Sequence, residues 1–104
     1  MELTMDILRK LCEERNVIFS LHVLKRLQER GILREDVIQA IRTGEIIEQY
    51  PSDFPYPSCL VMGYSIENEQ LHVVCGCNWE VVKIVTAYRP STAKFEVDLK
   101  TRKE

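Results

Sequence analysis

The N-terminal half of the chain spaces its hydrophobic residues three and four positions apart, as amphipathic helices do. This period predicts three short helices, over residues 3–15, between Ser20 and Gly31, and over residues 34–43. Ser20 is a good N-cap because its hydroxyl can accept a hydrogen bond from the first helical turn. Gly31 and Gly44 are typical of residues that end helices.

One side of the second and third predicted helices is apolar, and we expect that side to be buried. The residues concerned are Leu21, Val23, Leu24 and Leu27 in the second helix and Val37, Ile38, Ala40 and Ile41 in the third. Polar and charged residues occupy the opposite sides. Each helix is therefore expected to cover its neighbours on one side and to face solvent on the other.

The C-terminal half changes to the alternating, β-branched pattern of strands. The predicted strands are residues 46–50, 59–66, 71–77 and 81–88. The proline-rich bend at 51–57 cannot be helix or central sheet, and the turns at 67–70 and 78–80 are short enough to join antiparallel neighbours. Residues 95–99 alternate like an edge strand. We expect one α+β domain spanning 1–104, with N-terminal helices packed on one face of an antiparallel sheet of about four strands.

Composition places the chain among ordinary globular domains, since its 104 residues are 45% hydrophobic and 29% charged. A net charge of -2 argues against a broad basic surface for polyanions but is compatible with a small basic pocket. Residues 1–6 lack the basic start and apolar core of a signal peptide, and no apolar run approaches the roughly 18 residues of a membrane span. We expect a cytoplasmic protein without membrane contacts.

Four cysteines, Cys12, Cys59, Cys75 and Cys77, would allow two disulfide bonds in a secreted protein. Without a signal peptide, reduced thiols are the better interpretation. Cys75 and Cys77 are two positions apart, so in a strand both point to the same face, while His72 points to the face opposite Cys75. This spacing favours small buried thiols over a zinc site, and we predict no metal ligands.

His22, Arg26 and Arg30 follow one another at i, i+4 steps on the second predicted helix and so form one basic stripe. Histidine can transfer a proton near neutral pH, and the planar guanidinium group fits phosphate oxygens. Together these groups can support the cleavage of RNA without a metal. The same stripe can also be an ordinary solvated surface, with the arginines paired to Glu29 or Glu48.

Several stretches resemble, in order and spacing, the domain-of-unknown-function family 4258. In chain order, the first stretch is FSLH, followed by Arg26 and then by RGI. The next two are DV followed by GEIIE, and YP followed by PYPSCL. The last two are LHVV and TAYRP. The resemblance covers about residues 17–95 and implies a fold similar to RelE, barnase and colicin-type ribonucleases, with a shallow site across the sheet. Members resemble toxins of toxin–antitoxin pairs. The resemblance therefore implies an RNA substrate and a cognate antitoxin as partner, of the small zinc-finger type in some members.

On this resemblance we expect a metal-independent endoribonuclease whose catalytic residues are His22, Arg26, Arg30, His72 and Tyr88. The two histidines would share the general acid and base roles, in either order, and the arginines would bind the scissile phosphate. Tyr88 would hydrogen-bond the phosphate or stack on a base. Thr86 and Arg89 are the expected substrate-binding residues, and no cofactor is expected.

Most of these residues also have a structural interpretation. His72 can be a hydrogen-bonded core histidine, and Tyr88 and Trp79 can be aromatic residues of the core or of turns. The bend at 51–57 either simply joins two strands or forms one wall of a site. The main alternative function is a non-catalytic module of the same fold that binds protein or RNA.

Overall fold

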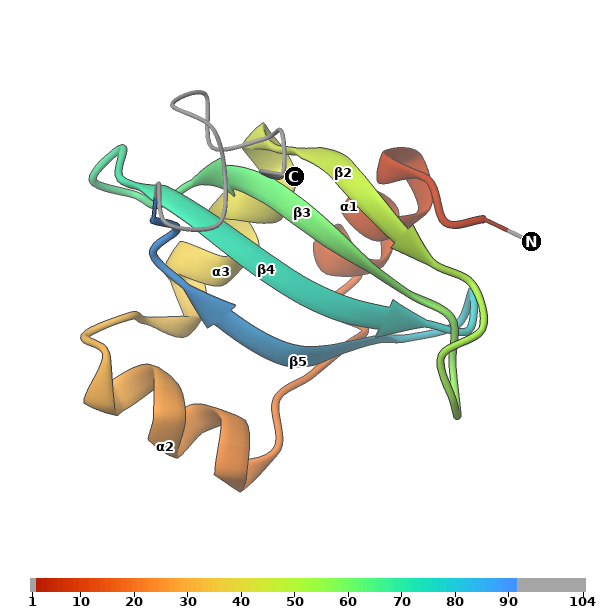
Figure 1. The fold of residues 1–104 in the computed structure, drawn as a ribbon, viewed down its shortest axis with the longest axis horizontal. Helices are drawn as coiled ribbons and strands as arrows, with labels where there is room; N and C mark the ends of the chain where they lie inside the picture. The colour runs from red at the N-terminus through yellow and green to blue at the C-terminus, as the bar shows by residue number, and fades with distance from the viewer. Residues whose placement is uncertain (1, 92–104) are drawn as a thin grey trace.

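The helices come first along the chain and most of the sheet follows in the computed structural model, which describes residues 2–91 (Figure 1). The elements in chain order are α1 (Met5–Glu13), β1 (Val17–Ile18), α2 (Leu21–Glu29), α3 (Arg34–Thr43), β2 (Glu45–Tyr50), β3 (Ser58–Tyr64), β4 (Gln70–Cys77) and β5 (Val82–Tyr88). The predicted α+β class is confirmed, and the three predicted helices precede the four predicted strands, although an additional strand, β1, lies between α1 and α2.

The three helices begin and end close to their predicted bounds, and two of them, α1 and α2, begin at a side-chain cap. The hydroxyl of Thr4 accepts a hydrogen bond from the backbone of Ile7 at 3.3 Å, and that of Ser20 accepts one from Val23 at 3.1 Å. Gly31 follows α2 with a φ of 68°, a left-handed conformation that glycine adopts without steric cost. Local sequence therefore determines where these helices start and where α2 stops.

The sheet has five strands within residues 2–91, in the order β1-β5-β4-β3-β2. The prediction of an antiparallel sheet of about four strands is therefore wrong in the number of strands and in the direction of one pairing. The additional strand is β1, whose Val17 and Ile18 pair in parallel with Val82 and Lys83 of β5. A run of two residues is too short to show an alternating pattern, so nothing in the sequence indicated this pairing. The remaining neighbours are antiparallel, as predicted.

Two of the helices cover one face of the sheet, and the third lies beside it. In Figure 1, α1 and α3 lie behind the sheet, whereas α2 runs alongside β5. Val23 and Leu27 are the buried residues of α2, but Leu21, which was predicted to be buried, is 86% exposed. Leu21 is rotated by about 200° from Val23 around the helix axis, so it faces away from β5.

The contact between α3 and β3 requires small residues because the two backbones approach closely. A Cβ added at Gly63 would lie 1.9 Å from the carbonyl oxygen of Ala40, and one added at Gly44 would lie 2.5 Å from the same atom. Neither distance is sterically possible. Gly44 does follow α3 as predicted, but its φ is -99°, so close approach rather than backbone conformation accounts for glycine there.

The core lies between the sheet and the helices α1 and α3. Cys75 and Cys77 are fully buried in it, as predicted, and Cys12 and Cys59 join them as free thiols. Over residues 2–91 no helix is long and apolar enough to cross a membrane, and no three His, Cys, Asp or Glu side chains are grouped to hold a metal. The strand predicted over residues 95–99 lies outside the described residues.

Candidate functional site

The face of the sheet turned away from α1 and α3 carries the predicted site residues of the strands, and we call it the distal face. Side chains alternate between the two faces of a strand, and the residues between those of the distal face belong to the core under the helices. On the central strands the distal face consists of Ser58, Leu60 and Met62 of β3, His72, Val74 and Gly76 of β4, and Lys83, Thr86 and Tyr88 of β5.

A β-bulge in β5 determines which residues share this face. Tyr88 pairs with His72 and Thr86 pairs with Val74, but the register then shifts, so that Lys83 pairs with Gly76. Without the bulge, Lys83 would point to the face opposite Thr86 and Tyr88. Sequence reasoning missed Lys83 as a site residue because strict alternation places it on the wrong face.

His72 and Tyr88 contact each other across neighbouring strands on the distal face. Their ring centroids are 5.5 Å apart and the rings are tilted by 58°. His72 is 0% exposed, whereas Tyr88 is half-buried. His72 therefore supports Tyr88 in this arrangement rather than meeting a ligand directly.

Arg30 connects the end of α2 to the same part of the distal face. Its Nη1 atom donates hydrogen bonds to the hydroxyl of Thr86 at 3.0 Å and to the carbonyl of Ala87 at 2.8 Å. Guanidinium carries five N–H donors, and within the described residues its Nε and Nη2 atoms make no hydrogen bond. Arg30 is thus held in place on one side and keeps donors for an anion on the other.

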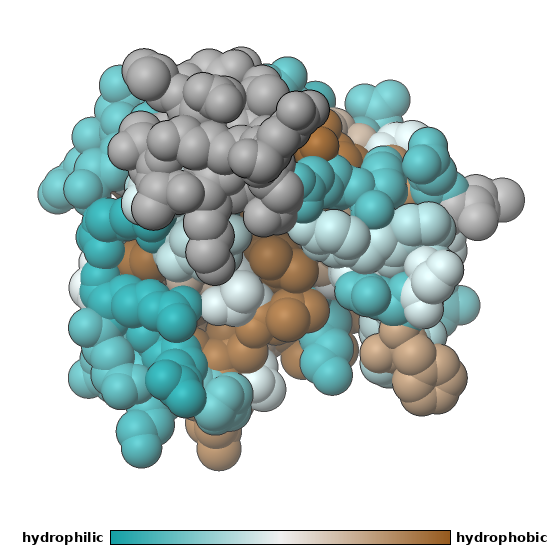
Figure 2. Space-filling model, viewed as in Figure 1, coloured by the Kyte–Doolittle hydropathy of each residue, from teal (hydrophilic) through white to brown (hydrophobic). Residues whose placement is uncertain are grey.

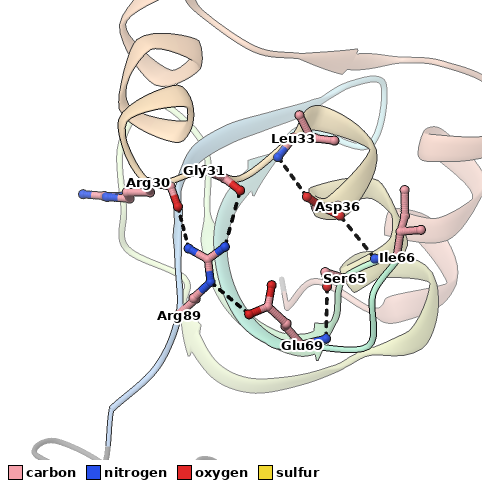
Figure 3. Close-up of polar contacts among 8 residues, drawn as sticks. All are labelled: Arg30, Gly31, Leu33, Asp36, Ser65, Ile66, Glu69 and Arg89. Carbon is pink, nitrogen blue, oxygen red and sulfur yellow. Dashed lines mark hydrogen bonds and ion pairs between the residues drawn. The ribbon is translucent and has the colours of Figure 1, made fainter.

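Arg89 holds the end of α2 where Arg30 is attached. Figure 3 shows its guanidinium donating to the carbonyls of Arg30, at 2.5 Å, and Gly31, at 3.4 Å, and pairing with the carboxylate of Glu69 at 3.4 Å. The carbonyls at a helix C-terminus carry partial negative charge, which favours a cation there. The side chain of Arg30 points away from this cluster in Figure 3, so Arg89 positions Arg30 through the backbone. Its predicted contact with substrate stays a prediction.

The side chain of Asp36 joins the turn after α2 to the turn between β3 and β4. One carboxylate oxygen of Asp36 accepts from the backbone of Leu33 at 2.9 Å and the other accepts from Ile66 at 3.2 Å (Figure 3). The hydroxyl of Ser65 accepts from the backbone of Glu69 at 3.0 Å. The bond from Ser65 holds Glu69, which pairs with Arg89, so the position of Arg30 depends on both of these turns.

His22 and Arg26 lie on the exposed surface of α2, away from the contacts just described. Along the helix axis Arg26 is about 6 Å and His22 about 12 Å from Arg30. In the described part of the chain, a side-chain hydrogen bond links Arg30 to Thr86 and a ring contact links His72 to Tyr88, and neither involves the side chain of His22 or Arg26. The predicted pairing of His22 with His72 as acid and base stays a prediction.

The buried thiols are unsuited to nucleophilic chemistry. Burial raises the pKa of Cys12 from its ordinary value of 9.0 to about 11, and burial also raises that of Cys77. A contact with Cys59, whose sulfur lies 3.9 Å away, and burial raise the pKa of Cys75. A thiol must lose its proton to act as a nucleophile, so these groups are inert near neutral pH.

Comparison with known proteins identifies a family. No curated protein and no solved structure matched the chain. A family model did match, over residues 19–89, which include α2, the strands β2 to β5 and all the predicted site residues. This chain therefore belongs to the family described as Domain of unknown function (DUF4258).

Proposed function

We propose that this protein is a metal-independent endoribonuclease and the toxin of a toxin–antitoxin pair. The observation that carries the proposal is Arg30, which is anchored by Thr86 and Ala87 and keeps the donors of Nε and Nη2 for a phosphate. Guanidinium binds phosphate through paired hydrogen bonds and stabilises the charge that develops during phosphoryl transfer. Tyr88, one alternation along β5 from Thr86, supplies a hydroxyl beside the same phosphate.

The proposed reaction uses the ribose of the RNA as the nucleophile. The 2′ oxygen bonds to phosphorus while the bond from phosphorus to the 5′ oxygen breaks, giving a 2′,3′-cyclic phosphate and a 5′-hydroxyl end. Arg30 stabilises the phosphorane, Tyr88 donates a proton to the leaving 5′ oxygen, and solvent accepts the 2′ proton. His72 holds the ring of Tyr88 and is a positioning residue in this scheme.

We assign His22 and Arg26 to the neighbouring phosphates of the strand. They extend the cationic side of α2 from Arg30 in steps of about 6 Å along the helix. This step is comparable with the spacing of successive phosphates in an extended single strand. The basic stripe then binds the RNA backbone, whereas cleavage takes place at the Arg30 end.

A labelled single-stranded RNA incubated with the purified protein and excess chelator tests this function. We expect the wild type to produce fragments with cyclic phosphate ends, and Arg30→Lys to cut at least 100-fold more slowly because an ammonium cannot replace the guanidinium fork. Lys25→Ala, on the same helix but outside the stripe, is the matched control and keeps full activity. Intact RNA with every protein, or equal rates for wild type and Arg30→Lys, would contradict the proposal.

The toxin role adds a partner, a cognate antitoxin that covers the cationic side of α2. We propose that an acidic segment of this antitoxin binds across Arg26 and Arg30, because charge complementarity steers such complexes. Induced expression of the wild type should arrest bacterial growth, and Arg30→Lys should not. Arrest of equal strength by both would show that growth inhibition does not depend on the proposed site.

A second candidate function, a non-catalytic protein-binding module, is favoured by a different surface. A cavity of about 470 Å³ opens on the side of the molecule that carries α1 and α3. It combines three arginines and one glutamate with apolar side chains, among them Arg15, Arg34, Arg42, Glu35, Phe19, Ile38 and Ile66. This combination fits an acidic segment with apolar residues. Protein binding lost in Arg34→Glu, together with no cleavage of any RNA, would favour this function.

A further inference from the structure

A second cavity lies on the distal face, between the proline-rich loop and the strands β4 and β5. Its volume is about 320 Å³. Figure 2 shows hydrophobic residues gathered over the same part of the sheet, where Val85 is 50% exposed. The loop and the strands both contribute lining residues, namely Asp53, Phe54 and Tyr56 from the loop and Val74, Gly76 and Lys83 from the sheet.

The loop forms a wall of fixed shape beside this cavity. The hydroxyl of Ser58 donates to the carboxylate of Asp53, whose backbone N–H donates to Tyr50 at 3.2 Å. The carbonyl of Pro57 accepts from Cys77 of β4 at 3.1 Å, which ties the loop to the sheet. A wall held in this way can present an aromatic ring to a ligand at little entropic cost.

Phe54 is the most exposed large apolar side chain in the described residues, at 93%. Apolar surface of this size is normally buried, and an exposed aromatic ring at the rim of a cavity is typical of a binding site. Tyr56 stands beside it over Gly76, where an added Cβ would lie 3.4 Å from the Cβ of Tyr56. This is an ordinary contact distance, so Tyr56 packs closely over the backbone of β4 at this position.

The cavity lies next to the proposed phosphate site along the distal face. Gly76 and Lys83 form one pair across β4 and β5, and Val74 and Thr86 form the next pair on the same face. These pairs are about 7 Å apart along β4, comparable with the length of one extended nucleotide. Val74 lines the cavity, while its partner Thr86 is bonded to Arg30.

We propose that this cavity binds a base of the single-stranded RNA whose phosphate lies at Arg30. The base stacks against Phe54 and Tyr56, and the exposed ammonium of Lys83 contacts the adjoining backbone. Stacking on aromatic rings is the common means by which proteins hold unpaired bases, and it needs no particular sequence. This inference rests on the proposed function, because it places the base beside the phosphate that Arg30 binds.

Equilibrium binding of a fluorescent 2′-O-methyl RNA hexanucleotide tests the inference, since this strand cannot be cut. We expect Phe54→Ala to weaken binding roughly 5- to 150-fold, the range for loss of one stacked base, and Phe54→Trp to bind as the wild type does. Leu21→Ala removes another exposed apolar side chain, outside the cavity, and should leave the affinity unchanged. A melting temperature for each variant verifies that it is folded.

An RNA strand from which one base has been removed distinguishes the loss of one stacked base from a general loss of affinity. Removing the base at one position should weaken binding to the wild type and should not weaken binding to Phe54→Ala further. Tight binding of the intact strand by the wild type with less than a twofold effect of Phe54→Ala would overturn the base site while leaving the proposed function in place. Failure of the wild type to bind or cut RNA would overturn both.

Discussion

At the scale of single residues, the site is an arginine held by another arginine. Arg89 donates to the carbonyls of Arg30 and Gly31, which follow α2. The side chain of Arg30 in turn donates to Thr86 on the distal face. Charged side chains contribute most to such arrangements when they bond to backbone groups that would otherwise lack a partner. Arg89 is therefore expected to act on the position of Arg30 and on the stability of α2 together.

Arg89→Ala tests that role. We expect the free energy of unfolding in urea to fall by about 1 kcal/mol, because the carbonyls at the end of α2 lose their donor. Arg89→Lys should recover part of this loss, since the ammonium keeps the charge but not the fork. A loss in Arg89→Ala no larger than that of the surface variant Lys25→Ala would mean that the end of α2 does not depend on this side chain.

The sequence predicted part of the site and missed the rest for reasons that individual residues explain. Thr86 and Tyr88 share a face as alternation predicts, and tertiary folding brings Arg30 to them. Lys83 was missed because a bulge inverts the alternation. The bend at 51–57 was considered as a wall of a site, but Phe54 was not singled out within it because a loop residue has no periodicity. Neither feature can be recognised in a single chain before the pairing of its strands is known.

At the scale of elements, the helices and antiparallel strands followed from local patterns, whereas β1 and the packing of α3 did not. The predicted bounds of the helices agree with the structure because caps and periodicity are local properties. The parallel pairing of β1 depends on residues more than 60 positions away, as in Val17 with Val82. The close approach of α3 to β3 likewise depends on Gly63, which the sequence pattern did not distinguish from other strand residues.

Two glycine-to-alanine variants compare the stability lost through a steric clash between elements with the stability lost through a strained backbone conformation. In Gly63→Ala the new methyl group would meet the backbone of Ala40, so α3 must move, and we expect a loss of roughly 3 kcal/mol or more. In Gly31→Ala no atom lies within 4 Å of the methyl group, and only the φ of 68° is strained, at a cost of about 1 kcal/mol. Urea unfolding of both variants measures which one loses more stability, and equal losses would contradict close packing of α3 on β3.

At the scale of the whole molecule, one core of apolar residues and neutral thiols joins the helices α1 and α3 to the sheet. Burial raises the pKa of Cys12 to about 11, so the folded protein keeps this proton at a pH at which the unfolded chain loses it. The unfolded state then binds fewer protons than the native state, and stability falls with rising pH. This loss begins near the ordinary thiol value of 9.0 and continues to about 11.

Chemical unfolding at a series of pH values measures this linkage. We expect the wild type to lose stability between pH 9 and pH 11 and Cys12→Ala to lose less over the same interval, because one of the buried thiols is gone. The comparison between the two proteins cancels the titration of tyrosines and lysines. Parallel curves for the wild type and Cys12→Ala would show that this thiol does not titrate between the folded and unfolded states.

At the same scale, the proposals concern two surfaces formed by residues 2–91, the distal face and the arginine-lined cavity beside α1 and α3. A crystal structure of the protein with the 2′-O-methyl RNA hexanucleotide distinguishes them most directly. The proposed function predicts a phosphate about 3 Å from the guanidinium of Arg30, beside Thr86, with one base against Phe54. A phosphate bound by Arg34 and Arg42 in the other cavity, with the distal face empty, would contradict it.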